Sequence, residues 1–117
     1  MPRSTQLGAS IRTKVRIPGP YAELLRESAR RNMRSYSAEI ALAIARYIEG
    51  PPAESAPRWK RGALVGTDMR LPAHLYSELA RIASMYGRSR NQEIILAVER
   101  HLKREGLLPS SEAHTAF

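Results

Sequence analysis

The stretch Thr13-Lys14-Val15-Arg16-Ile17-Pro18 decides how this chain folds, and it returns later as Thr67-Asp68-Met69-Arg70-Leu71-Pro72. In both copies large apolar residues alternate with polar ones, and a proline ends the run. A period of two predicts a short strand with one buried face and one exposed face. The sequence therefore predicts two short strands built on one pattern.

The two strands belong to a longer internal repeat. An offset of 54 residues aligns residues 13–50 with residues 67–104 without a gap, and about a third of the aligned positions are identical. Two unrelated helical segments would not share the strand, its proline and a central Arg-Ser pair together. Identical positions include Arg16/Arg70, Pro18/Pro72, Arg34/Arg88, Ser35/Ser89 and Glu39/Glu93.

Each predicted strand is followed by two segments with the apolar spacing of helices. Ser35 and Ser89 are good N-caps, because a hydroxyl accepts an unpaired backbone N–H, and Gly87 suits a left-handed C-terminal position. Ser28 and Asn32 interrupt one apolar stripe, so we expect that helix to pack less well than its counterpart. The predicted helices span residues 21–33, 36–49, 73–86 and a last segment between Ser89 and Gly106.

Neither unit is expected to be stable alone. A lone strand leaves backbone N–H and C=O groups unpaired, and about forty residues bury too little surface. Antiparallel pairing of the two strands solves both problems, and a linker of fifteen residues, which reaches roughly 50 Å, allows it. The expected fold is mainly α with a two-stranded antiparallel ribbon, (β-α-α) twice, forming a pseudo-dimer. The segments are an arm with Arg3 (1–11), the first unit (12–50), a linker (51–65), the second unit (66–106) and a tail (107–117).

Composition narrows the functional class. The net charge is +8 and the sequence pI is about 10.6, which suits a polyanionic partner, although solubility alone is another reading. Without cysteine, a membrane-length apolar run or a secretory signal, a cytoplasmic protein is the expectation. The three histidines are too scattered for a metal site, and neither a nucleophile set nor a phosphate loop is present. We therefore expect no enzyme, no metal and no cofactor.

Strand, proline, helix, Gly-Arg-Ser turn and second helix resemble the ribbon-helix-helix family of the Arc and MetJ repressors. The similarity is strongest around Gly87-Arg88-Ser89-Arg90-Asn91-Gln92-Glu93-Ile94 and covers residues 12–50 and 66–106. Two such units in one polypeptide resemble TraY-type accessory proteins of plasmid transfer. The resemblance implies that both strands enter the major groove of double-stranded DNA and that their outward side chains read bases.

The resemblance also assigns site residues by position. Because Lys14 faces Asp68 if the pseudo-twofold axis crosses the strand centres, we predict a cross-strand pair and an asymmetric DNA site. The start of each second helix would hold phosphate, with structural capping by Ser35 and Ser89 as an equal alternative. The expected base readers are Arg12, Lys14, Arg16, Asp68 and Arg70, and the expected phosphate contacts are Ser35, Ser37, Ser89 and Asn91.

Two charged pairs, Arg34/Glu39 and Arg88/Glu93, match a buried network of Arc. Alanine occupies the position of the third member in both units, at Ala43 and Ala97. We therefore expect simple Arg–Glu pairs that fix the turn between the two helices of each unit.

The predicted function is sequence-specific DNA binding, either as a transcriptional regulator or repressor, or as a relaxosome accessory protein in conjugation. Such factors bind side by side, and the exposed face of the first helix, including Arg26 and Arg30, could contact a neighbour. An antitoxin-type role in protein interaction, with DNA binding secondary, is the alternative. A further alternative pairs each strand with its copy in another chain.

Overall fold

The computed structural model describes residues 9–59 and 62–108. In these ranges the order is β1 (Ser10–Pro18), α2 (Gly19–Arg31), α3 (Tyr36–Glu49), β2 (Leu64–Pro72), α4 (Ala73–Tyr86) and α5 (Arg90–Arg104). This order confirms the predicted succession of a strand and two helices, twice. The arm residue Arg3 and the tail beyond residue 108 lie outside the described residues.

The strands β1 and β2 pair antiparallel, as predicted, and form a two-stranded sheet. The register places Lys14 opposite Asp68, at the middle of both nine-residue strands. These two residues are also equivalent in the sequence repeat. A twofold axis that relates the two units therefore passes between Lys14 and Asp68.

Both strands are longer than the sequence predicted. Ser10 and Ile11, expected in the arm, belong to β1, and Leu64 and Val65, expected in the linker, belong to β2. Antiparallel pairing explains the extra residues, because each early residue of one strand lies opposite the proline-ended segment of the other. The backbone continues this arrangement at Ala9, whose carbonyl accepts from the Ala73 N–H at 3.0 Å.

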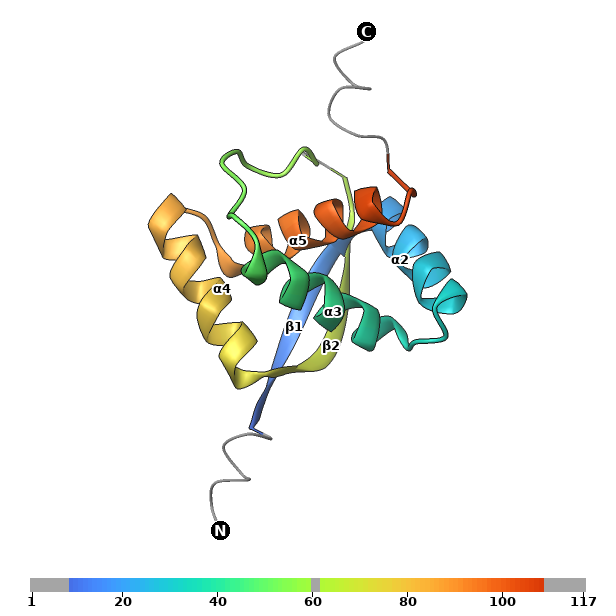
Figure 1. The fold of residues 1–117 in the computed structure, drawn as a ribbon, viewed down its shortest axis with the longest axis horizontal. Helices are drawn as coiled ribbons and strands as arrows, with labels where there is room; N and C mark the ends of the chain where they lie inside the picture. Colours follow the sequence, from blue (N-terminus) through green and yellow to red (C-terminus); the bar gives the residue numbers. More distant parts are fainter. Residues whose placement is uncertain (1–8, 60–61, 109–117) are drawn as a thin grey trace, which may run out of the picture.

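The inner face of the sheet packs on the helices. Val15, Ile17, Met69 and Leu71 are buried, as their alternation predicted. In Figure 1, α3 and α5 lie in the middle of the molecule, while α2 and α4 flank them on opposite sides. The core that these elements share includes Leu25, Ile40, Ile44, Tyr47, Leu79, Ile82, Ile94, Val98 and Leu102.

The turns between the helices of the two units share a backbone shape but not a residue type. Gly87, directly after α4, has a φ of 65° and so is left-handed, as expected. Its equivalent after α2 is Met33, with a φ of 57° and 92% of its side chain exposed. The left-handed Met33 ends α2 at Arg31, two residues before the predicted end.

The linker is fastened to the second unit by polar side chains. Arg100 donates to the Pro51 carbonyl at 2.8 Å, and Arg88 donates to the Ala53 carbonyl at 2.7 Å. The buried Glu99 carboxylate accepts from the Arg58 N–H at 3.0 Å. This segment is therefore more than a tether, and its path is fixed by residues of α5 and the turn before it.

Glu99 and Trp59 join the linker to the first unit. The same Glu99 carboxylate accepts from the Tyr21 hydroxyl at 2.7 Å. The Tyr21 and Trp59 rings lie 5.8 Å apart, and Trp59 packs against the core. Gly62 is required beside this ring, because it has a φ of 113° and an added Cβ would overlap the Trp59 indole.

The segment after α5 packs more closely than expected. The N–H groups of Leu107 and Leu108 both donate to the Leu102 carbonyl, and both leucine side chains pack against the core. Leu107 and Leu108, which were predicted to belong to a loose tail, therefore pack on the protein. Within the described residues no helix is long and apolar enough to cross a membrane.

Replacing Met33 by glycine should stabilise the chain. A left-handed residue with a side chain costs about 1–2 kcal/mol, part of which is offset by the greater freedom of glycine in the unfolded chain. We expect the free energy of unfolding to rise by about 0.5–1 kcal/mol, measured by urea denaturation. Gly87→Ala is the matched control and should lower it, whereas a Met33→Gly variant less stable than the parent would contradict the account.

Replacing Glu99 by alanine should release the linker. Tyr21 and the Arg58 N–H would each lose their acceptor, which costs about 1–3 kcal/mol for a buried donor. We expect lower stability in urea and faster proteolysis within residues 51–59. The exposed Glu54→Ala is the control, and equal cleavage rates in the two variants would refute the clamp.

Candidate nucleic-acid interface

The outer face of the β1–β2 ribbon carries the residues predicted to read bases. Because the side chains of a strand alternate, each pair on this face is separated from the next by one inward-facing pair. All five predicted readers are exposed and lie on this face together, on a rigid two-stranded backbone: Arg12, Lys14, Arg16, Asp68 and Arg70.

The centre of this face is the predicted cross-strand pair. Lys14 Nζ lies 3.7 Å from Asp68 Oδ1, and the two side chains are 48% and 65% exposed. Gly66 lies beside them, and a Cβ there would be in van der Waals contact with Lys14 Cδ, at 3.4 Å. The stem of Lys14 therefore extends over β2, and the prediction of a Lys14–Asp68 pair is confirmed.

The positive charge of the ribbon is unevenly distributed. β1 presents the three cations Arg12, Lys14 and Arg16, whereas β2 presents Arg70 and the acidic Asp68. Arg12 faces Arg70, and such a like-charged pair is destabilising unless a counterion or an anionic partner lies near it. The ribbon thus offers four cations and one anion to a partner.

The serines at the starts of α3 and α5 act as helix caps. Ser35 Oγ accepts from the Ala38 N–H at 3.1 Å, and Ser89 Oγ accepts from the Gln92 N–H at 3.1 Å. Gln92 completes a capping box, because its Oε1 accepts from the Ser89 N–H at 2.9 Å. The capping role left open by the sequence is present, and contact with phosphate stays a prediction.

Asn91, another predicted phosphate residue, is bound to the ribbon. Its Oδ1 accepts from the Arg16 N–H and its Nδ2 donates to the Arg16 carbonyl, each at 2.9 Å. The side chain therefore serves as a strand partner at the outer edge of β1. It fixes the start of α5 beside the reading face, and Ser37 holds the equivalent, half-buried position in α3.

A groove of about 480 Å³ joins the strand to the start of α5. It brings together Lys14 and Arg16 from β1 with Ser89, Arg90 and Asn91 from the other side. Predicted base readers and predicted phosphate contacts thus meet in one cationic hollow. Ser35 and Ser37 start the other central helix and do not line this groove.

Two buried carboxylates behind the helix starts join the units to each other. Tyr47 of α3 donates to Glu93 of α5 at 2.7 Å, and His101 Nε2 of α5 lies 2.7 Å from Glu39 Oε2 of α3. Tyr47 and His101 are equivalent in the repeat, so each unit contacts the buried carboxylate of the other from the same position. The expected Arg–Glu pairs are present, Arg34 with Glu39 and Arg88 with Glu93. They are not simple pairs, because each carboxylate also contacts a residue of the other unit.

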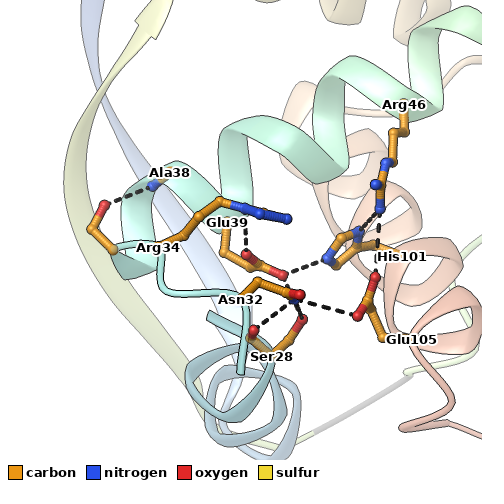
Figure 2. A network of polar contacts seen from close by, with 9 residues as sticks. Ser28, Asn32, Arg34, Ala38, Glu39, Arg46, His101 and Glu105 are labelled. Atoms are coloured by element: carbon orange, nitrogen blue, oxygen red, sulfur yellow. Dashed lines mark hydrogen bonds and ion pairs between the residues drawn. The ribbon is translucent and has the colours of Figure 1, made fainter. Parts of the chain in front are cut away.

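Figure 2 shows the network around Glu39. The carboxylate accepts from the Ser28 hydroxyl and lies 3.1 Å from Arg34 Nε. Ser28, which interrupts the apolar stripe of α2, is fully buried for this reason, and the predicted poor packing of α2 is not found there. Behind His101, Arg46 Nη1 lies 3.4 Å from His101 Nδ1 and 3.6 Å from Glu105 Oε2.

These contacts shift the pKa values of Glu39 and Tyr47. Burial alone would raise the pKa of Glu39, but the bonds from Ser28 and His101 and the charge of Arg34 lower the pKa below its ordinary value. Burial, with the carboxylate of Glu93 beside it, raises the pKa of Tyr47 to about 12. Glu39 is therefore held as a carboxylate and Tyr47 as a hydrogen-bond donor at neutral pH.

Sequence reasoning missed Tyr47, His101 and Glu99. A signal was present, because a hydroxyl and an imidazole occupy equivalent positions within otherwise apolar helical stripes. Their acceptors lie 46 and 62 residues away along the chain, and only the packing of α3 on α5 brings them together. The spacing of residues within one helix therefore cannot predict which carboxylate each side chain contacts.

Comparison with protein families gives one result for the second unit. Residues 68–109 match the model of the Arc-like DNA binding domain. The matched residues include the second half of β2 with α4 and α5, and so comprise one strand-helix-helix unit. Comparison with curated proteins and with solved structures gave no match.

Glu39→Gln should change how stability depends on pH. Because the pKa of Glu39 is lowered in the folded chain, its contribution is present above the ordinary value of 4.5 and is lost as pH falls through the lower folded value. We expect the variant to be less stable than the parent at pH 7, by about 1–3 kcal/mol, with a difference that shrinks towards pH 3. Urea denaturation at both pH values measures this, with the exposed Glu54→Gln as control. A difference that is constant with pH would contradict the assignment.

Proposed function

We propose that the chain binds double-stranded DNA sequence-specifically, with the β1–β2 ribbon in the major groove and its two units acting as a ribbon-helix-helix pseudo-dimer. The observation that supports this best is the exposed ribbon face, on which four cations stand on paired strands backed by four helices. The match of residues 68–109 to an Arc-like DNA binding domain supports the same proposal for β2, α4 and α5.

The dimensions of the ribbon suit the groove. Paired strands lie about 4.8 Å apart, and a major groove about 12 Å wide admits a two-stranded ribbon. Arg12, Arg16 and Arg70 each offer a planar fork that meets O6 and N7 of guanine together. Strand backbone holds these forks with less freedom than a loop would, which favours direct reading of bases.

Phosphate contacts would position the ribbon. The starts of α3 and α5 offer unpaired backbone N–H groups and the positive end of the helix dipole. Ser35, Ser37 and Ser89 lie in these first turns, and Asn91 fixes the α5 start against β1. The net charge of +8 adds attraction that weakens with salt.

The biological role would be that of a binding protein rather than an enzyme. A transcriptional regulator or repressor and a relaxosome accessory protein of plasmid transfer both fit, and both would act on DNA in the cytoplasm. Because the units differ in sequence, one chain should favour an asymmetric site. Several chains could lie side by side on DNA through the outer face of α2, where Arg30 is 72% exposed and pairs with Glu27.

Replacing Arg16 or Arg70 by alanine should weaken specific binding by about 1–3 kcal/mol and relax the preference at one base position. Selection of bound fragments from random DNA, followed by titration of the chosen duplex, measures both effects. Arg81→Ala is the control, because Arg81 pairs with Glu78 on α4 and is not on the ribbon. Equal losses on every duplex would instead place the ribbon arginines on phosphate.

A further inference from the structure

The ribbon contains a feature that general DNA affinity does not explain. Asp68 lies at the centre of the face proposed to meet a polyanion, and its side chain is 65% exposed. A carboxylate there is repelled by phosphate unless it accepts a hydrogen bond from a base or pairs with a cation. Its partner Lys14 is itself half-exposed, so the pair has polar atoms left for a ligand.

We propose that Lys14 and Asp68 together read one G·C base pair at the centre of the DNA site, with Lys14 on the guanine and Asp68 on the cytosine. This inference rests on the proposed function and names a part of its specificity. The basic residue of the central pair contacts the purine, and the acidic residue contacts the pyrimidine.

The chemistry of the pair matches the major-groove edge of G·C. Guanine presents two acceptors, N7 and O6, and cytosine presents one donor, the N4 amino group. The ammonium of Lys14 only donates and the ionised carboxylate of Asp68 only accepts. Guanine O6 and cytosine N4 are hydrogen-bonded to each other at about 2.9 Å, close to the spacing of the protein pair. The separation of Lys14 Nζ from Asp68 Oδ1 is 3.7 Å.

An A·T pair fits less well. A carboxylate that accepts from adenine N6 would also approach the acceptor N7, which repels it, and the thymine methyl group stands beside O4 where the ammonium would bind. In G·C both purine groups are acceptors, so the ammonium can contact either. The pair should therefore discriminate between the two kinds of base pair.

The position of the pair gives the bound chain a direction. Lys14 and Asp68 are equivalent residues that face each other across the twofold relation between the units. A twofold axis at that point would otherwise make both orientations on DNA similar at the centre. The Lys14 stem lies over β2 beside Gly66, with Cδ 3.4 Å from where a Cβ of residue 66 would stand. The unlike central pair then distinguishes G·C from C·G.

Selection from random DNA tests this with three proteins: the parent, the exchange variant Lys14→Asp with Asp68→Lys, and Asp68→Asn. The parent should prefer G·C at the central position about tenfold over A·T, in one orientation relative to the flanking bases. The exchange variant keeps the net charge and the ion pair. The preferred central base pair should therefore change from G·C to C·G, while the preferences at the flanking base pairs stay the same. Melting curves show whether each variant is folded.

The second variant covers a failure of the exchange to fold. Asparagine reads adenine N6 and N7, so Asp68→Asn should replace the preferred central cytosine by adenine. An exchange variant with unchanged central orientation, or a parent with selected flanks and no central preference, would overturn the inference alone. A parent that selects no sequence at all would overturn the proposed function as well.

Discussion

The backbone pairing of β1 with β2 is the constraint on which the rest of the structure depends. Neither strand pairs with a third strand among the described residues, and an unpaired strand on the surface of a small domain exposes its donors and acceptors. Pairing buries Val15, Ile17, Met69 and Leu71 in one layer above four helices. It also turns the alternate residues outward, so the cationic face and the core arise from the same hydrogen-bonded ladder.

The side chains favour pairing between unlike units. If two first units paired with the same register, Lys14 would face another Lys14, and two second units would place Asp68 against Asp68. Like charges directly opposite are destabilising, whereas the observed arrangement joins Lys14 to Asp68 at 3.7 Å. The buried bonds Tyr47–Glu93 and His101–Glu39 also cross between the units, and the linker is fastened by Glu99 and Arg88. These contacts make the two halves of the chain complementary rather than interchangeable.

Local pattern predicted the strands, the bounds of α3 and α4, the left-handed Gly87 and the register of Lys14 on Asp68. Those features follow from periodicity and turn chemistry, which are visible over a few residues, and from the comparison of the two repeated units. The polar contacts could not be predicted in this way. Asn91 on the Arg16 backbone, and Glu99 on the linker, join residues far apart in the chain through side chains whose types have many other uses. The turn after α2 was also not predicted, because Met33 adopts a left-handed conformation that the equivalent position of the second unit fills with glycine, Gly87.

The most direct test of the strand pairing is an isotope-filtered NMR experiment on a mixture of labelled and unlabelled chains at low concentration. The account predicts short proton distances between facing residues of β1 and β2, such as Val15 and Thr67, within single labelled chains of 13.1 kDa. The absence of such contacts, or their appearance between a labelled and an unlabelled chain, would contradict a ribbon formed by the two halves of one polypeptide.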